Sequence, residues 1–156
     1  MAYALDTGGI ATPIGIVSVT AEGPELTRVA IGEPAGAPGS ALVKAALDQL
    51  AAWFAGERTG FDLPLCGPQR PRGLALRQAI CAIGYGKTAT YGALAQGWGS
   101  SARAIGQACA RNPFPLIVPC HRVLGAGDAL GFYSAGSGAD TKRWLLDFER
   151  GAARLL

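Results

Sequence analysis

The residues best suited to chemistry lie together at positions 112–123, in the segment Asn-Pro-Phe-Pro-Leu-Ile-Val-Pro-Cys-His-Arg-Val. Its three prolines fix the backbone and disfavour a helix, so the segment can hold one side chain at a fixed place. That side chain is Cys120, and His121 and Arg122 follow it directly. Cysteine attacks as its thiolate, and nearby cationic groups lower a thiol pKa from about 8.5 toward about 3.5–7.5. The segment therefore predicts a nucleophilic cysteine with a lowered pKa.

His121 is the single histidine of the chain and the natural base for Cys120. An imidazole can accept a thiol proton directly or through a water, and a carboxylate can orient the ring. Neighbouring side chains point in different directions along a chain, which favours a bridging water. The alternative is a buried cysteine beside a structural histidine, and the residue types alone leave both interpretations open.

The remaining cysteines are Cys66, Cys81 and Cys109. No pair has the two-residue spacing of zinc or redox motifs, and the N-terminal half contains no histidine, so we expect neither a metal nor another cofactor. We also expect no second thiol beside Cys120. With no secretion signal or membrane-spanning stretch in the sequence, the chain is predicted to be a cytoplasmic protein with reduced thiols.

Charge is divided unevenly along the chain, whose net charge is +3. Residues 1–70 carry four Lys/Arg against seven Asp/Glu, whereas residues 71–156 carry ten against four. A basic C-terminal half suggests an anionic partner such as nucleic acid, although many basic surfaces serve only solubility. The apolar fraction of 49% is enough for a folded core.

Two domains are expected, 1–67 and 68–156, separated by a Pro- and Gly-rich linker at 66–73. The first domain should contain strands within 12–33, broken by a turn at 22–24, and a short strand at 61–65. Between them, apolar residues at helical spacing predict an amphipathic helix over 43–54, with Ser40 as its cap.

The second domain should be mainly helical. Leu76, Ile80 and Ile83 share one helical face that ends at Gly84. Helices near 91–96 and 102–111, joined by a tight turn, suggest a helix-turn-helix, although two ordinary packing helices would give the same pattern. Asp140 or Thr141 should cap a final helix, whose buried side carries Trp144, Leu145 and Phe148.

The sequence Pro119–Val123, preceded by Asn112-Pro and a short apolar run, resembles the active-site signature of the O6-alkylguanine-DNA alkyltransferases. This signature is highly specific, and the resemblance covers nearly the whole chain. Further matching segments are Thr12–Gly15, Phe54–Arg58, Phe61–Leu65, Ile83–Thr88, Thr90–Gly92, Ala102–Gly106, Tyr133–Gly136 and Lys142–Glu149. The resemblance implies an α/β (α+β) fold, with a small RNase H-like sheet-and-helix domain followed by a helical domain with a winged-helix-like helix-turn-helix.

The activity implied is direct-reversal DNA repair. An alkyl group would move irreversibly, once per molecule, from O6-alkylguanine in double-stranded DNA to Cys120, with O4-alkylthymine as a second candidate substrate. The resemblance assigns His121 as the base acting through a water, Glu149 as the carboxylate that orients it, and Asn112 as the residue that holds the turn. A monomer is expected.

The resemblance also implies a set of DNA-binding and substrate-binding residues. Tyr91 would help to rotate the damaged nucleotide out of the duplex, and Arg103 would fill the gap. Small residues on the second helix would let its backbone approach the minor groove, although close helix packing explains small residues equally well. Val123 and Ser134 would offer backbone groups to guanine. The predicted set comprises Tyr91, Ala102, Arg103, Ala104, Gly106, Arg111, Pro115, Arg122, Val123, Tyr133 and Ser134.

The chain departs from the family pattern in three places, one of which is the turn before Ala102, shorter by about one residue. Residues 72–77 lack the usual Phe-Gln and Trp, with Arg77 near the Trp position, and the loop 134–142 carries an insertion. Three other classes of protein compete with an alkyltransferase. A lesion-binding relative would lack the acceptor cysteine, a DNA-binding regulator would not need the Cys-His motif, and an unrelated cysteine hydrolase would not need the Arg103 helix.

Overall fold

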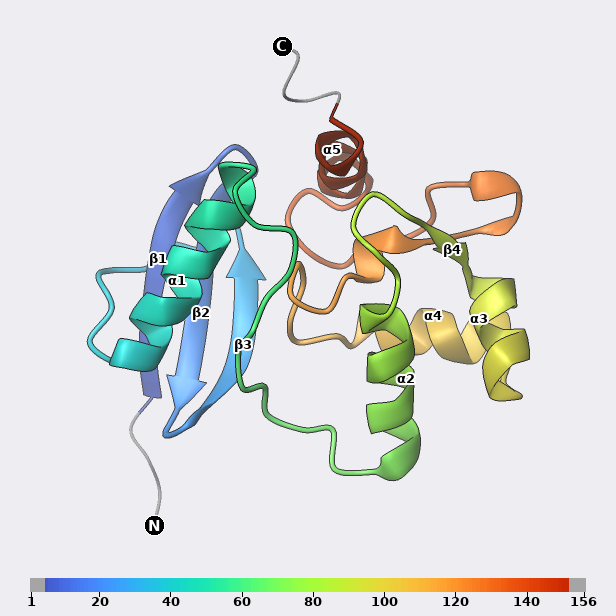
Figure 1. Ribbon diagram of the computed structural model, residues 1–156, viewed down its shortest axis with the longest axis horizontal. Coiled ribbons are helices and arrows are strands. Elements are labelled where there is room, and N and C mark those ends of the chain that lie inside the picture. The colour runs from blue at the N-terminus through green and yellow to red at the C-terminus, as the bar shows by residue number, and fades with distance from the viewer. Residues whose placement is uncertain (1–4, 152–156) are drawn as a thin grey trace. The chain divides into compact units, whose positions relative to one another are not determined.

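A computed structural model of the chain describes residues 5–151. These residues divide into two compact units, Met1–Gly67 and Pro68–Leu156 (Figure 1). The boundary lies inside the Pro- and Gly-rich segment 66–73. The helical part of that segment begins at Pro71, a residue whose missing N–H suits the first turn of a helix.

The N-terminal unit is an antiparallel sheet covered on one face by a helix (Figure 1). Its strands pair in chain order: β1 (Leu5–Thr12), β2 (Gly15–Glu22) and β3 (Glu25–Ile31). Helix α1 (Ala41–Phe54) is capped by Ser40, whose side chain accepts a hydrogen bond of 3.2 Å from the backbone N–H of Val43. The cap and the helix are therefore as predicted. The buried core of this unit includes Val17, Val19, Leu26, Val43, Leu50 and Trp53.

Two predictions for this unit need correction. The sheet starts earlier than expected, because β1 occupies Leu5–Thr12, where Gly8 and Gly9 obscure the strand pattern. The segment 61–65 is not a strand but makes one parallel bridge, between Leu26 and Leu65. Its backbone bonds run from Leu26 N to Pro64 O at 2.8 Å and from Cys66 N to Leu26 O at 2.8 Å. Pro64 has no N–H to donate, which prevents a longer ladder.

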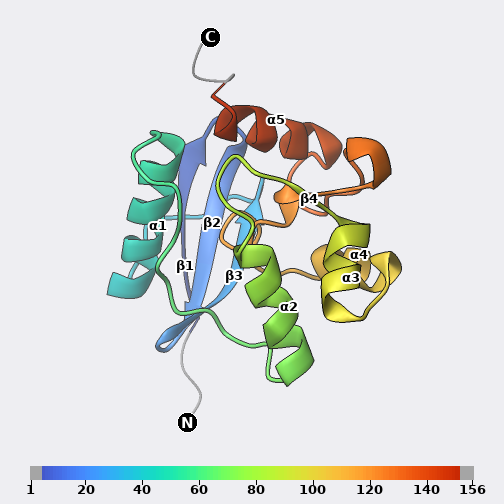
Figure 2. The same ribbon diagram turned by 45° about the vertical axis from the view of Figure 1, so that its right-hand side comes forward.

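The C-terminal unit is mainly helical, as Figure 2 shows. Its α-helices are α2 (Pro71–Cys81), α3 (Tyr91–Trp98), α4 (Ala102–Ala110) and α5 (Ala139–Glu149). Short 3-10 helices, η1 (Cys120–Arg122) and η2 (Ala126–Asp128), flank β5 (Val123–Leu124), which pairs in parallel with β4 (Ala89–Thr90). The predicted α+β fold class, with a small sheet-and-helix part followed by a helical part, is confirmed.

Helices α3 and α4 form the predicted helix-turn-helix. Thr90 and Ser101 cap them, accepting hydrogen bonds of 3.1 Å from the N–H groups of Ala93 and Ala104. Gly99 ends α3 with φ of 60°, a left-handed conformation that glycine adopts without steric cost. These local signals fix both the ends of the helices and the tight turn between them.

Two details of the C-terminal unit differ from expectation. Helix α2 ends at Cys81, so Ile83 lies outside the helix. Its side chain is still buried, but it belongs to the turn that follows α2. Helix α5 begins at Ala139 after Gly138, and neither Asp140 nor Thr141 caps it. Gly138 has φ of 66° and turns the chain into the helix, while the Thr141 hydroxyl accepts a bond from Ser137 N at 2.9 Å.

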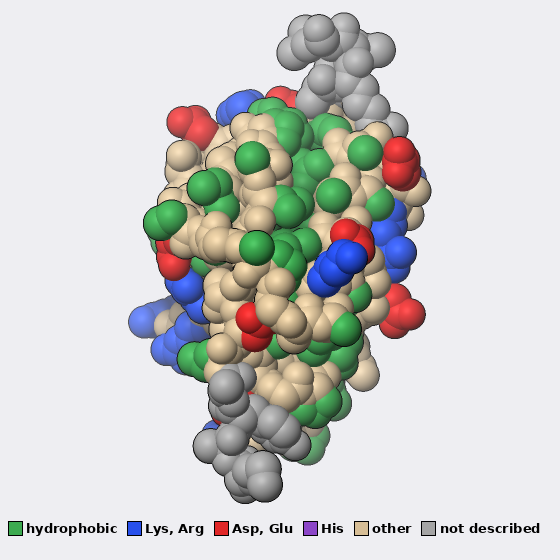
Figure 3. Space-filling model, turned by 90° about the vertical axis from the view of Figure 1, so that its left-hand side faces the viewer, with side chains coloured by type: hydrophobic (Ala, Val, Ile, Leu, Met, Phe, Trp, Pro, Cys, Tyr) green, Lys and Arg blue, Asp and Glu red, His purple; other side chains and the backbone are tan. Residues whose placement is uncertain are grey.

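The surface in Figure 3, seen from the side where α1 and β1 lie in Figure 1, is mostly hydrophobic or uncharged. Acidic and basic side chains are interspersed on it. Mixed charge of this kind gives this face little attraction for a polyanion. Within residues 5–151, no helix is long and apolar enough to span a membrane.

Candidate active site

The proline-rich loop 112–120 holds Cys120 in place through Asn112. The Asn112 side chain donates from Nδ2 to Val118 O at 3.0 Å and to Cys120 Sγ at 3.4 Å, and its Oδ1 accepts from Phe114 N at 2.9 Å. One side chain thus ties together the start, the middle and the end of the loop. Leu116 has φ of 76° in this loop, a conformation that a branched residue adopts only when its surroundings enforce it.

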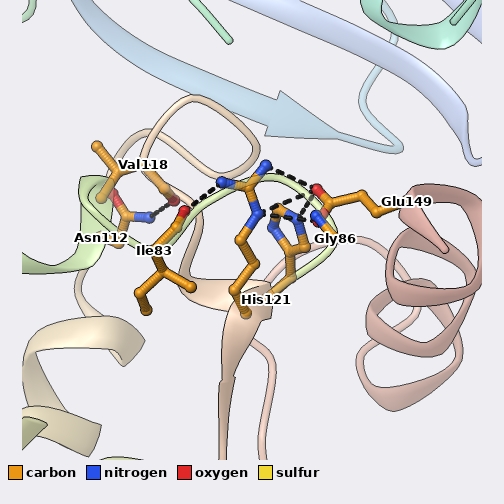
Figure 4. A network of polar contacts seen from close by, with 7 residues as sticks. Ile83, Gly86, Asn112, Val118, His121 and Glu149 are labelled. Carbon is orange, nitrogen blue, oxygen red and sulfur yellow. Dashed lines mark hydrogen bonds and ion pairs between the residues drawn. The ribbon is translucent and has the colours of Figure 1, made fainter. Parts of the chain in front are cut away.

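Glu149, at the end of α5, receives hydrogen bonds from three residues (Figure 4). Its Oε2 lies 2.7 Å from His121 Nε2. The Arg122 guanidinium donates to the same carboxylate at 2.9–3.2 Å, and Gly86 N donates to Oε1 at 3.1 Å. The Glu149 side chain is 1% exposed. Buried carboxylates need several donors of this kind, so the network is built to keep Glu149 ionised.

The pKa directions agree with that geometry. Burial raises the pKa of Glu149, but hydrogen bonds from His121 and Arg122 outweigh it and lower the value to about 2. Burial lowers the pKa of His121, with the Glu149 hydrogen bond opposing it. His121 is therefore neutral at rest, and its Nε2 carries the proton that faces the carboxylate. The lone pair stays on Nδ1, which is buried and has no partner among the described residues.

Cys120 has an unexpected neighbour, because its side chain is hydrogen-bonded to that of Cys109 on α4. The expectation that no second thiol lies beside Cys120 was therefore wrong. Cys109 and burial raise the pKa of Cys120 well above its ordinary value, while the Asn112 hydrogen bond opposes them. The lowered pKa predicted for Cys120 was also wrong, since Arg122 is neutralised by Glu149 and His121 is uncharged. Cys120 is a thiol at rest and needs a base to react.

A pocket of about 420 Å³ reaches Cys120. Six of the predicted site residues line it: Tyr91, Arg103, Gly106, Cys120, Tyr133 and Ser134. The structure thus brings together residues from α3, α4, η1 and the loop before α5. Burial raises the pKa of Tyr91 to about 12, so its hydroxyl stays protonated. The Tyr133 hydroxyl is buried and has no partner among the described residues.

Six of the predicted binding residues do not line this pocket: Ala102, Ala104, Arg111, Pro115, Arg122 and Val123. Arg122 is buried in the Glu149 ion pair, and its Nη1 donates to Ile83 O at 2.7 Å, so it supports the catalytic network instead of facing a ligand. Val123 is buried, with its carbonyl accepting from Lys142 Nζ at 2.7 Å. Pro115 is buried in the loop and is not among the residues that line the 420 Å³ pocket. Arg111 lines a separate cavity of about 170 Å³, which also borders Asn112 and Cys120.

No contact within the described structure explains why residues 102, 104 and 106 of α4 are small. Ala102 and Ala104 are exposed at the start of the helix. A Cβ placed on Gly106 would meet no atom within 4 Å, so packing inside the described structure does not require glycine there. Glycine inside a helix costs about 1 kcal/mol relative to alanine. The surface of α4 is therefore open at positions 102, 104 and 106.

Sequence reasoning missed Lys142 as a functional residue. Its side chain is fully buried, and its Nζ donates to Val123 O and lies 5.7 Å from the centre of the Tyr91 ring. Burial lowers the pKa of Lys142, and the thiols of Cys109 and Cys120 act in the opposite direction. The sequence did indicate that Lys142 is buried, because Lys142, Leu145 and Glu149 fall on the same helical face as the apolar residues of α5.

Phe132 is a second residue that the sequence did not single out. It lines the 420 Å³ pocket, yet its side chain is 70% exposed. As for metals, no group of three or more His, Cys, Asp or Glu residues in the described part of the chain could hold an ion.

A buried thiol in a pocket lined by a helix-turn-helix, with a histidine–carboxylate pair following it, is the arrangement expected of a DNA-binding protein with a nucleophilic cysteine. Comparison with known proteins names the family. The family model described as "6-O-methylguanine DNA methyltransferase, DNA binding domain" matches residues 74–151. A methylated-DNA–protein-cysteine methyltransferase of Mycobacterium tuberculosis is 38% identical over 157 residues, covering 92% of both chains. The present chain belongs to this family of methyltransferases.

Other similar proteins and solved structures carry the same family description. The constitutive methylated-DNA–protein-cysteine methyltransferase of Bacillus subtilis is 45% identical over 107 residues, covering 67% of this chain and 64% of its own. The crystal structure of the M. tuberculosis O6-methylguanine methyltransferase matches with a TM-score of 0.82 and 35% identity, covering 96% of this chain and 94% of that one. A complex of the M. tuberculosis protein with DNA matches with a TM-score of 0.82 and 37% identity, covering 94% and 93%.

Proposed function

We propose that the protein repairs DNA by moving an alkyl group from the O6 atom of guanine to Cys120 in a single, irreversible event. The observation that carries this proposal is the juxtaposition of Cys120, beside the 420 Å³ pocket, with a His121–Glu149 pair at 2.7 Å. The family of the chain and its similarity to a protein crystallised with DNA support the same reaction.

The reaction starts from a protonated thiol, because the pKa of Cys120 is raised. Nδ1 of His121 takes the proton, directly or through a water, and Glu149 stabilises the imidazolium that forms. Arg122 and Gly86 hold the carboxylate so that it does not rotate away from the ring. His121 acts as the base, whereas Glu149, Arg122 and Gly86 act as positioning groups.

The Cys120 sulfur then attacks the alkyl carbon. A carbon–sulfur bond forms, the bond from carbon to guanine O6 breaks, and its electron pair stays with the guanine. The base becomes neutral by taking up one proton. Tyr91 lines the pocket, and its raised pKa keeps the hydroxyl protonated before the reaction. It can pass its proton to the base and take one back from the His121 imidazolium, so that the proton that left Cys120 ends on the guanine.

DNA reaches this pocket across α4. Because the alkyl carbon lies inside a duplex, the nucleotide must rotate out, at a cost of a few kcal/mol. Arg103 is exposed and lines the pocket, so it is placed to occupy the vacated position. Ala102, Ala104 and Gly106 leave the surface of the helix low enough for the minor groove. In this proposal Arg111, further along, contributes only to phosphate attraction.

The product explains the stoichiometry. S-alkyl cysteine is a thioether, and neither carbon–sulfur bond has a good leaving group. We therefore infer one alkyl group per protein molecule. Intact mass measurement after incubation with methylated DNA tests the proposal, with one methyl group on the Cys120 peptide as the expected result. A protein that binds lesions without repairing them would show no added mass, and a hydrolase would turn over.

A further inference from the structure

Cys109 and Cys120 form a pair of thiols inside the substrate pocket. Cys109 lies in the last turn of α4 and Cys120 at the start of η1, eleven residues later. Both line the 420 Å³ pocket, both are nearly buried at 8% and 4% exposure, and their side chains are hydrogen-bonded to each other. The two remaining cysteines, Cys66 and Cys81, are exposed.

The proposed repair reaction uses only Cys120, so the position of Cys109 calls for a separate explanation. As a small hydrophobe it would suit any part of the core, yet it lines the pocket that contains the nucleophile. Hydrogen-bonded thiols titrate as one unit, in which the first thiolate is stabilised by the S–H of its partner. That hydrogen bond lowers the pKa of Cys109. Lys142, buried nearby, adds positive charge that also favours a thiolate.

We propose that Cys109 and Cys120 are a redox site, at which a small peroxide closes a disulfide that reversibly masks the alkyl acceptor. The masking of repair rests on the proposed function of Cys120, whereas the disulfide itself does not. The pocket that both thiols line is large enough to admit a molecule of the size of hydrogen peroxide.

The chemistry balances in two steps. The Cys109 thiolate attacks one peroxide oxygen, the O–O bond breaks, and a sulfenic acid and hydroxide form. The hydroxide takes the proton of Cys120, whose sulfur attacks the Cys109 sulfur and displaces a second hydroxide, which is protonated to water. Two thiols have lost two protons and two electrons, and hydrogen peroxide has become two waters. A dithiol reductant reverses the change.

The consequence is protection of a cysteine that is used only once. A sulfenic acid that finds no thiol is oxidised further to sulfinic acid, which ordinary dithiols do not reduce. With Cys109 in contact, oxidation stops at the disulfide. The acceptor is inactive while oxidised but is recovered intact when the reductant returns.

The test is oxidation of the full-length protein with hydrogen peroxide, followed by intact mass and peptide mapping without reduction. The expected result is the loss of two hydrogen atoms and a cross-linked pair of peptides containing Cys109 and Cys120. Transfer from O6-benzylguanine should be lost and then restored by dithiothreitol. A cross-link to Cys81 or Cys66, or only added oxygen on Cys120, would overturn the proposal.

Variants separate the two thiols. In Cys109→Ser no disulfide can form, so the part of the transfer loss that dithiothreitol reverses after peroxide should fall by about tenfold or more. This holds whether peroxide leaves Cys120 unreacted or oxidises it to sulfinic acid. Cys81→Ser is the matched control and should retain the recovery of the unmodified protein. If Cys109→Ser does not fold, Cys109→Ala and the peptide map of the unmodified protein still test whether the disulfide forms.

One further experiment separates a failure of the redox site from a failure of the proposed repair function. Protein already alkylated with O6-benzylguanine should form no disulfide, because Cys120 carries the benzyl group. If untreated protein never accepts benzyl but the disulfide still forms, the redox site stands and the assignment of Cys120 as acceptor fails. Full transfer to Cys120 without any disulfide after peroxide would support the acceptor and overturn the redox site.

Discussion

The Nε2 atom of His121 lies 2.7 Å from Oε2 of Glu149, and both side chains are almost completely buried. The contact joins η1 to the end of α5 and fixes which imidazole nitrogen bears a proton. The nitrogen that remains basic, Nδ1, has no partner in the described part of the chain. The pair therefore supplies a neutral base on the residue that directly follows Cys120, whose thiol is protonated at rest.

Cys120→Ala should abolish alkyl transfer and retain binding to alkylated duplex DNA, because it removes the sulfur but leaves the pocket and α4 in place. Intact mass and a gel-shift assay measure the two properties. Cys81→Ser, which removes an exposed thiol, should transfer normally. Sustained turnover by the unmodified protein, or a methyl group on Cys66, Cys81 or Cys109, would contradict the proposed stoichiometry.

Glu149→Gln should slow single-turnover transfer by a factor on the order of 10² to 10⁴, in line with general-base catalysis. Loss of the carboxylate leaves the imidazolium without its counter-charge. The deficit should narrow at alkaline pH, where solvent removes the thiol proton. Asp147→Asn, which neutralises another carboxylate of α5, is the control. A deficit that does not change with pH would mean that Glu149 only supports the fold.

Arg103→Ala should slow transfer from duplex DNA much more than transfer from free O6-benzylguanine, which needs no base flipping. Rates should be compared at low and moderate salt, because a role in phosphate contact would largely disappear at low salt. Arg143→Ala removes an exposed arginine of α5 and controls for charge alone. Equal losses on both substrates would rule out the proposed stacking role.

Gly106→Ala should stabilise the free protein by about 0.5–1 kcal/mol, since the added methyl meets no atom within 4 Å and alanine favours the helix. It should weaken binding to duplex DNA, because the methyl group stands where α4 is proposed to approach the groove. Gly97→Ala, equally free of contacts on α3, controls for helix stabilisation. Unchanged DNA affinity would return Gly106 to a purely local role.

The free energy of unfolding should fall as the pH is lowered, in two pH ranges, one due to His121 and one due to Glu149. His121 is held neutral with its pKa lowered from 6.5, so the unfolded chain gains a proton first and stability declines below about pH 6.5. Glu149 has its pKa lowered from 4.5 to about 2, so its contribution is complete above 4.5 and is lost between 4.5 and 2. Denaturant unfolding at several pH values measures both windows. Glu149→Gln should lose the lower one, and an unchanged profile would contradict this assignment.

The sequence by itself determined the local elements and the reacting group. Ser40, Thr90, Ser101 and Gly99 specify helix ends through contacts within a few residues, so the helix-turn-helix could be predicted. The prolines around Cys120 restrict the backbone whatever surrounds them. The spacing of Pro-Cys-His-Arg-Val therefore indicated a nucleophile before any tertiary contact was known.

The tertiary structure alone decided how that nucleophile is tuned. Arg122 neighbours Cys120 in sequence, yet its charge is neutralised by Glu149, 27 residues away, so the expected lowering of the Cys120 pKa does not occur. Cys109 reaches Cys120 only because α4 packs beside the proline-rich loop. Charge pairing and burial depend on which groups come into contact in the folded chain, and the spacing of residues in the sequence does not show those contacts.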